Sequence, residues 1–247
     1  MLNPYLAHGW ATSPARLAIA AMVTLALAVV ARVLHGVNRA GALAGGVACF
    51  LLFAGIGPTA FVALSVLFLM TLIATRLGYR RKLALGLAER REGRNAWQIL
   101  ANLAVAGLGS VIFSVTGNRV WLVAVLAALC EAATDTVASE IGQYRGSYAC
   151  MITTWNRVPA GTDGGITISG SITGLAAGVV VAIVGAMGGM VPYPQIWIPV
   201  ATGFAGMLID SILGATLQRR GWISNQAVNF FSTAAAAGLA YAVTRLG

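Results

Sequence analysis

Three of the seven acidic residues in this chain stand within ten positions, in the segment that runs from Glu131 to Glu140. The segment directly follows Val120–Cys130, an apolar run long enough to form most of a membrane span. A carboxylate in hydrocarbon costs roughly 2.5–3.5 kcal/mol on insertion scales, so such residues pair, bind an ion or line a wet cavity. At four-residue spacing, Glu131, Asp135 and Ser139 share one helical stripe, whereas Glu140 faces another side. The segment therefore indicates a functional centre, with a buried polar network between helices as the alternative.

A second candidate element is the glycine-rich stretch from Gly161 to Gly165, which precedes an apolar run. A glycine-rich turn that opens a helix presents backbone N–H groups and the positive end of the helix dipole, which suits a phosphate group. The stretch is not a Walker A loop, because the sequence has no G-x-x-x-x-G-K-[ST] and its only lysine is Lys82. Beyond the stretch, the glycines continue in tandem G-x-x-x-G spacing up to Gly178, which is more typical of close helix packing than of ligand contact.

Asp210 is a lone carboxylate inside another apolar run. It suits Mg²⁺, which takes one or two carboxylates from a protein and completes its shell with water and phosphate oxygens. The alternative is a structural salt bridge to Arg157, Arg219 or Arg220.

Side-chain amides recur at helical spacing in two places. Asn95, Gln98 and Asn102 share one helix face, and Asn225 and Asn229 repeat the pattern four residues apart. Such amides suit hydrogen bonds to a base or a ribose. They equally suit solvation of the start of a membrane span, and both interpretations stay open.

Composition places these residues in a membrane protein. Of the 247 residues, 58% are hydrophobic and only 9% are charged, whereas soluble domains are about 25% charged. The mean hydropathy is +0.82. We therefore expect an all-α polytopic membrane helix bundle that forms a single integral membrane domain over residues 1–247.

Apolar windows predict about eight spans, within a range of seven to nine, because ~20 apolar residues cross the hydrocarbon. The expected spans cover 15–34, 40–55, 59–75, 97–115, 120–141, 166–188, 196–217 and 227–243. A polar, glycine-rich connection, Gly142–Gly165, joins the fifth to the sixth. The second and third spans are short and only Gly55–Pro58 separates them, so a re-entrant pair is the alternative there.

Thirteen of the 16 basic residues fall in one set of loops, and the other side holds only Arg16, Arg119 and Arg245. Because loops rich in lysine and arginine stay in the cytoplasm, we expect the basic loop 76–96 to be cytoplasmic and both termini to face outward. This topology explains the net charge of +9, so the charge does not indicate a nucleic acid partner. It also brings five of the seven acidic residues to one depth near the cytoplasmic face, which packing alone explains poorly.

Several of these segments resemble, in the same order, a known family. The matching segments are Arg94–Asn102, Ala133–Gly142, Val158–Thr167, Asp210–Gln218 and Asn225–Phe230. They look like the DUF92 family of membrane proteins, which includes the transmembrane protein 19 type and the plant and cyanobacterial phytyl-phosphate kinases. The resemblance covers nearly the whole chain from Arg39. More distantly, the chain is similar to CTP-dependent polyprenol kinases and CDP-diacylglycerol synthases.

The resemblance implies a membrane prenyl-phosphate kinase that uses Mg²⁺ and CTP or another NTP to convert an isoprenoid monophosphate to the diphosphate. Apolar grooves between spans would take the isoprenoid chain. The alternatives are a polyprenol kinase, a lipid cytidylyltransferase or, outside the enzymes, a cation- or proton-coupled transporter. We expect the cytoplasmic membrane of a bacterium or archaeon, an active site on its cytoplasmic side and, as a further possibility, a homodimer.

The same resemblance, taken with the residues above, assigns roles within the site. Catalysis is expected from Asp135, Glu140, Asp210 and Arg157, with Arg157 on the transferred group or the acceptor phosphate. Metal binding is expected from Asp135, Asp210 and Glu131. Nucleotide contacts are expected from Gly161, Thr162, Asp163, Gly164, Gly165, Asn95, Gln98, Asn102, Ser211, Gln218, Asn225 and Asn229.

Overall fold

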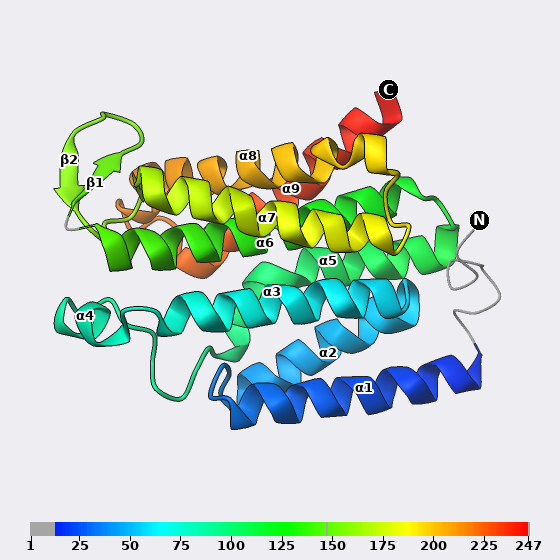
Figure 1. Cartoon of the computed structure of the whole chain (residues 1–247). Coiled ribbons are helices and arrows are strands. Elements are labelled where there is room, and N and C mark those ends of the chain that lie inside the picture. The colour runs from blue at the N-terminus through cyan, green and yellow to red at the C-terminus, as the bar shows by residue number, and fades with distance from the viewer. Residues whose placement is uncertain (1–12, 147, 247) are drawn as a thin grey trace.

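The computed structural model describes residues 13–146 and 148–246, and these residues form nine α-helices and a small sheet (Figure 1). The helices are α1 (Pro14–Val33), α2 (Arg39–Gly55), α3 (Pro58–Arg76), α4 (Tyr79–Ala84), α5 (Ala96–Thr116), α6 (Val120–Arg145), α7 (Ile168–Met187), α8 (Trp197–Leu213) and α9 (Asn225–Leu246). A 3₁₀ turn, Tyr193–Gln195, precedes α8, and a π-helical segment, Gly214–Gln218, continues it. Residues 1–12 and 247 of the expected single domain lie outside the described part.

Seven of the described helices are long and apolar enough to cross a membrane, where α8 is counted with its 3₁₀ and π-helical extensions over Tyr193–Gln218. Helix α2 is a shorter apolar helix of 17 residues. The expected all-α polytopic membrane bundle is therefore confirmed. Within the described part of the chain, seven helices are candidate membrane spans, and α2 is an eighth apolar helix that is shorter. The expected spans agree with the helices to within two residues at most ends. The exceptions are α6, which continues to Arg145, and α8 and α9, whose limits differ by up to four residues.

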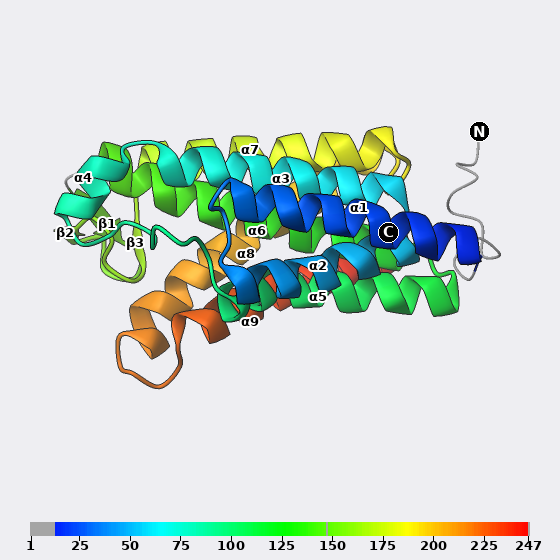
Figure 2. The same cartoon turned by 90° about the horizontal axis from the view of Figure 1, so that it is seen from below.

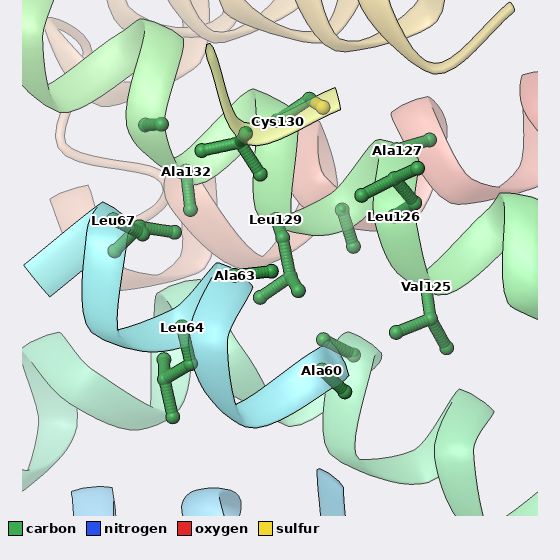
Figure 3. Packing of buried hydrophobic residues seen from close by; sticks show 14 of the residues in the cluster. Ala60, Ala63, Leu64, Leu67, Val125, Leu126, Ala127, Leu129, Cys130 and Ala132 are labelled. Carbon is green, nitrogen blue, oxygen red and sulfur yellow. The ribbon is translucent and has the colours of Figure 1, made fainter. Parts of the chain in front are cut away.

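Helix α6 is the centre of the bundle and packs against α3, α5, α7, α8 and α9 (Figure 1). Its first eleven residues are apolar on every face, and such a helix must be enclosed by others. Figure 3 shows Leu129 of α6 extending toward Ala63 and Leu64 of α3, within the main hydrophobic cluster. The carboxylates of α6 are therefore held on the most buried helix of the protein.

Glycines let α7 approach α6 closely. A β-carbon at Gly170 or Gly174 would meet the carbonyl oxygen of Ala138 or Thr134 on α6. Gly178 continues the row against the Thr134 side chain. The tandem G-x-x-x-G spacing therefore serves helix packing, as predicted from the sequence.

The connection between α6 and α7 is more ordered than the sequence indicated. Strands β1 (Tyr148–Met151), β2 (Arg157–Pro159) and β3 (Gly165–Ile166) form an antiparallel sheet in the order β2-β1-β3. Strands of two to four residues are too short to show an alternating apolar pattern, so the sequence predicted only a polar connection. The sheet holds the glycine-rich turn against the end of α8.

One end of the bundle carries α4, the sheet and the α8–α9 connection, and both views show this arrangement (Figures 1 and 2). Helix α1 starts and α9 finishes toward the opposite end (Figure 1). The loop 76–96 lies at the end with the sheet, so the basic residues gather there. The start of α1 and the end of α9 lie at the same end of the bundle, as expected for two termini on one side, and the side of the membrane stays a prediction.

Candidate functional site

A polar cavity of about 360 Å³ opens at the end of the bundle that carries the sheet, between α5, α6, α8, α9 and the glycine-rich turn. Asp135, Glu140 and Asp210 line it. So do eleven of the twelve residues expected to contact nucleotide: Gly161, Thr162, Asp163, Gly164, Gly165, Gln98, Asn102, Ser211, Gln218, Asn225 and Asn229. Segments that lie far apart in the chain thus supply one site.

Asp135 on α6 and Asp210 on α8 face this cavity from two different helices. Their carboxylates lie close enough for their charges to interact. The Ser232 hydroxyl oxygen on α9 lies 3.3 Å from Asp210 Oδ2, which places α8 and α9 side by side at the cavity. These two aspartates therefore bring two carboxylates from different helices to one cavity.

Glu131 lies below the cavity and is only 1% exposed. Its Oε1 accepts a hydrogen bond from the Ser232 hydroxyl at 2.7 Å, and its Oε2 accepts one from Thr233 at 2.8 Å. Both oxygens are thus held by α9, and Glu131 is not among the residues that line the cavity. The expectation of Glu131 as a metal ligand does not fit this geometry, and we interpret it as a support for Asp210 through Ser232.

The sequence predicted that five acidic residues lie at one membrane depth, and the structure differs from this prediction. Glu131 and Glu140 are nine residues apart on α6, or ~14 Å along the axis at 1.5 Å per residue. The residues of α6 that line the cavity run from Asp135 to Gln143, so the cavity follows the end of α6 and stops short of Glu131.

The fit of a metal ion depends on what else would share its coordination shell. Among residues 13–146 and 148–246, no group of three histidine, cysteine or acidic side chains is arranged to hold a metal. Mg²⁺ usually takes only one or two carboxylates and fills its shell with water and phosphate oxygens. Asp135 and Asp210 fit this pattern, so a magnesium site here would be formed jointly with a phosphate ligand.

Glu140 is held by a buried cation. Lys82 on α4 is fully buried, and its Nζ lies 2.5 Å from Glu140 Oε2. The same Nζ donates to the carbonyl oxygens of Ala74 and Thr75 at the end of α3, and the Thr75 hydroxyl donates to Glu140 Oε1 at 2.9 Å. Glu140 therefore lines the cavity while it joins α3, α4 and α6.

Among the described residues that line the polar cavity, Arg94 is the one arginine. Its Nη2 lies 3.7 Å from Glu140 Oε1, its Nη1 donates to the Thr136 hydroxyl at 3.4 Å, and its charge acts on Asp135. Arg157, expected to bind the transferred group or the acceptor phosphate, instead lies exposed on β2 with its guanidinium 5.0 Å from the Tyr148 ring. Arg157 is not among the residues that line the cavity, and its guanidinium lies over Tyr148 on the neighbouring strand instead.

The amides form a chain between α5 and α9. Gln98 donates to Glu89 Oε2 at 2.9 Å, Asn102 donates to the Gln98 carbonyl oxygen at 2.8 Å, and Asn229 donates to Asn102 Oδ1 at 3.4 Å. Asn95 differs from them, because it forms a reciprocal capping box with Gln98 at the start of α5. Of the two open interpretations, Asn95 therefore satisfies the helix start, and the other amides face the cavity.

The glycine-rich turn packs against α8 as well as facing the cavity. Gly164 has a φ of 77°, and a β-carbon there would meet Ala215 in the π-helical segment. A β-carbon on Gly165 would stand 2.9 Å from the Thr162 carbonyl oxygen inside the turn. Partial burial of its carboxyl group raises the pKa of Asp163, and the nearby Arg219 and Gln218 oppose this effect. Packing thus requires these glycines whether or not a phosphate binds.

A family model described as integral membrane protein DUF92 matches residues 22–237. The chain belongs to the DUF92 family. It is 30% identical over 199 residues to an uncharacterized membrane protein of Synechocystis, covering 78% of this chain and 77% of the relative. It is 29% identical over 224 residues to an uncharacterized membrane protein of Methanocaldococcus jannaschii, covering 88% and 90%. It is 29% identical over 203 residues to the chloroplastic protein VTE6 of Arabidopsis thaliana, covering 78% of this chain and 61% of VTE6. No solved structure matches.

Two residues of this DUF92 chain belong to the site although sequence reasoning gave them no role in it. Lys82 is the only lysine in 247 residues, and this rarity was the one feature of the sequence that could have indicated a special role for it. Arg94 was hidden among the arginines of the basic loop, where its position directly before the α5 cap was the available clue. Both act from segments that precede α6 in the chain, so only the fold brings Arg94 to the lining of the cavity and Lys82 to Glu140 behind that lining.

Proposed function

We propose that this DUF92 protein is a membrane prenyl-phosphate kinase that transfers a phosphoryl group from CTP or another NTP to an isoprenoid monophosphate. The observation that carries the proposal is the polar cavity in which Asp135 and Asp210 meet eleven expected nucleotide contacts. The resemblance to phytyl-phosphate kinases supports the choice of acceptor. The location beside membrane-spanning helices suits a lipid whose phosphate reaches the surface.

The reaction needs alignment and neutralisation of charge more than covalent help from the protein. An oxygen of the acceptor monophosphate forms a bond to the γ-phosphorus of the NTP. The bond from that phosphorus to the β–γ bridging oxygen breaks, and the nucleoside diphosphate leaves with the electron pair. Because the attacking group is already an anionic phosphate, no strong general base is required. This agrees with a cavity whose described lining holds no histidine.

The chain's own residues would divide this work among them. Asp135 and Asp210 would hold Mg²⁺, which supplies neutralisation of phosphate charge when it is bound. Arg94 would place a guanidinium beside the phosphates, in the role first expected of Arg157. The turn Gly161–Gly165 would follow the nucleotide phosphates, and the amides of α5 and α9 would contact the base or ribose.

The cavity's position bears on the transporter alternative. A secondary transporter usually binds its substrate near the middle of the membrane, between internal repeats. Here the cavity opens among the sheet, the basic loop and the glycine-rich turn at one end of the bundle. This position favours a substrate that enters from the aqueous side, as a nucleotide does.

Purified protein incubated with a panel of γ-labelled NTPs, Mg²⁺ and a set of prenols and prenyl monophosphates tests the proposal. We expect label on prenyl monophosphates only, and its loss in Asp210→Asn. Glu92→Gln is the matched control, because Glu92 lies exposed in the basic loop and its change should leave transfer intact. Label on free prenols would favour a polyprenol kinase, and transfer of the nucleotidyl group would favour a cytidylyltransferase. Transfer to no lipid with any NTP would refute the kinase.

A further inference from the structure

A second cavity, of about 330 Å³, lies beside the first, between the peripheral helices α1, α2 and α3 and the inner helices α5 and α6. We call it the apolar chamber. Its lining includes Leu27 and Ala28 on α1, Gly45 and Gly46 on α2, and Leu64 and Phe68 on α3. Glu89, Arg94, Asn102 and Thr136 line both cavities, so the two spaces adjoin at the level of Arg94.

The part of the apolar chamber lined by the basic loop, which we call its mouth, is strongly basic. Arg76, Arg90, Arg91 and Arg94 line it, against the single carboxylate of Glu89. Guanidinium groups recognise phosphate through charge-assisted hydrogen bonds. An apolar interior behind a mouth of this kind is complementary to an amphiphile with a phosphate head and a hydrocarbon tail.

A buried hydroxyl lies between the mouth and the apolar interior. Thr71 on α3 lines the chamber and is 9% exposed. Within the described part of the chain, its Oγ1 has no hydrogen-bond partner. A buried polar group left in this state is unfavourable unless a ligand or water completes it. Thr71 stands one helical turn before Thr75, and the Thr75 hydroxyl donates a hydrogen bond to Glu140 of the polar cavity. Thr71 is therefore placed to meet the ester end of a lipid phosphate.

We propose that the apolar chamber holds the hydrocarbon chain of a single-chain isoprenoid phosphate, and that Gly45 and Gly46 on α2 determine how long a chain it accepts. This inference rests on the proposed kinase function and adds the location of the acceptor. The chamber's volume is near the lower limit of ligand pockets, which span roughly 300–1,000 Å³. That size suits one chain rather than the two of a glycerophospholipid.

The two glycines leave room that a larger side chain would fill. A β-carbon on Gly45 would lie 3.7 Å from Ile99 Cγ2, and one on Gly46 would lie 3.5 Å from Thr24 Cγ2. Both are ordinary contacts, so a β-carbon fits at either position without moving the backbone, and the further atoms of leucine would take up space in the chamber that the glycines line. Leucine also favours a helix more than glycine does. A loss of function in these variants would therefore report on the chamber and not on folding.

Photocrosslinking tests the location without requiring turnover. The probe is farnesyl monophosphate with a diazirine at the end of its chain, added to full-length protein without nucleotide. We expect crosslinks on α2 and α3 in wild type, and at least a 10-fold loss in Gly45→Leu. The matched control is Gly238→Leu, an exposed α9 glycine whose β-carbon would meet nothing within 4 Å. Crosslinks confined to α7, α8 or α9, which do not line the chamber, or unchanged labelling in Gly45→Leu, would overturn the inference.

Acceptor length supplies a second readout. Gly45→Leu should raise the KM for farnesyl monophosphate by at least 10-fold and leave that for dimethylallyl monophosphate, which has one isoprene unit, within about 2-fold. Equal effects on both acceptors would contradict a role in chain length. Thr71→Val should weaken farnesyl monophosphate binding by about 3- to 10-fold, the effect of one lost hydrogen bond.

The test separates this inference from the proposed function. Wild-type protein that crosslinks in the chamber but transfers no phosphoryl group would keep the binding site and refute the kinase. Native mass spectrometry identifies the competing source of lipid phosphate. A glycerophospholipid that occupies wild type, is lost in Gly45→Leu and resists displacement by farnesyl monophosphate would overturn the isoprenoid assignment.

Discussion

At the scale of single residues, the carboxylates of the site differ in what holds them. Asp135 and Asp210 line the polar cavity, whereas both oxygens of Glu131 are occupied by hydroxyls of α9. The sequence placed Glu131 and Asp135 on one helical stripe but could not tell which end of that stripe reaches solvent. That difference depends on α9, which follows Glu131 by about a hundred residues.

Asp135→Asn and Asp210→Asn should each reduce turnover by at least ~100-fold, because each removes one of the two carboxylates that would hold the Mg²⁺ that neutralises phosphate charge. If both serve one magnesium-dependent step, the double variant should be little slower than either single variant. Steady-state rates for the three proteins check this. Melting temperature is the control: wild type should gain stability with Mg²⁺ and nucleotide together, and the variants should not. Variants that melt early yet keep the ligand-induced gain would show that the aspartates hold helices together.

Glu131→Gln tests the distinction between the two kinds of carboxylate. The amide keeps the shape of the side chain and can still bond the Ser232 and Thr233 hydroxyls. Turnover should therefore stay within about 10-fold of wild type, far above Asp210→Asn. Rates measured over a range of Mg²⁺ concentrations should give an unchanged requirement for the metal. A Glu131→Gln variant that needs much more Mg²⁺ would restore Glu131 to the metal site.

At the scale of elements, the long helices were predictable and the short elements were not. Each span is an apolar run of about 17 residues or more, and such runs are visible without knowledge of their neighbours. Helix α4 has six residues and the strands have two to four, so their patterns are too short to read. The cavity depends on these short elements, because α4 carries Lys82 and the sheet positions the glycine-rich turn.

Lys82→Met should destabilise the protein by ~3–5 kcal/mol, because it leaves Glu140 without its buried cation. The double variant Lys82→Met with Glu140→Gln should recover part of that loss, since position 140 then carries no charge that needs a buried cation. Thermal or chemical unfolding in detergent measures both. Arg80→Met on the same short helix is the matched control, because Arg80 is exposed. Equal losses in the control and in Lys82→Met would mean that the Lys82–Glu140 pair does not hold α4.

At the scale of the whole molecule, one end of the bundle collects charge and chemistry together. The basic loop and the sheet lie there (Figure 2). Residues of the basic loop line both the polar cavity and the mouth of the apolar chamber. The Lys/Arg asymmetry was readable from the sequence because it needs only the order of the spans. The contact between the two cavities was not readable, since it depends on how α2, α3 and α5 surround Arg94. A nucleotide-dependent kinase requires this end to face the cytoplasm.

Cysteine labelling checks that orientation. Cys49 and Cys130 are buried, so only the half-buried Cys150 needs replacement, by alanine, to give a quiet background. Single cysteines at Arg80 and Arg91, both exposed in or beside the basic loop, should react with an impermeant maleimide only in inside-out vesicles. A cysteine at the exposed Pro192, between α7 and α8, should react only in intact cells. The reverse pattern would place the polar cavity on the outer surface, away from the cytoplasmic nucleotide pool, and the kinase proposal would fall with it.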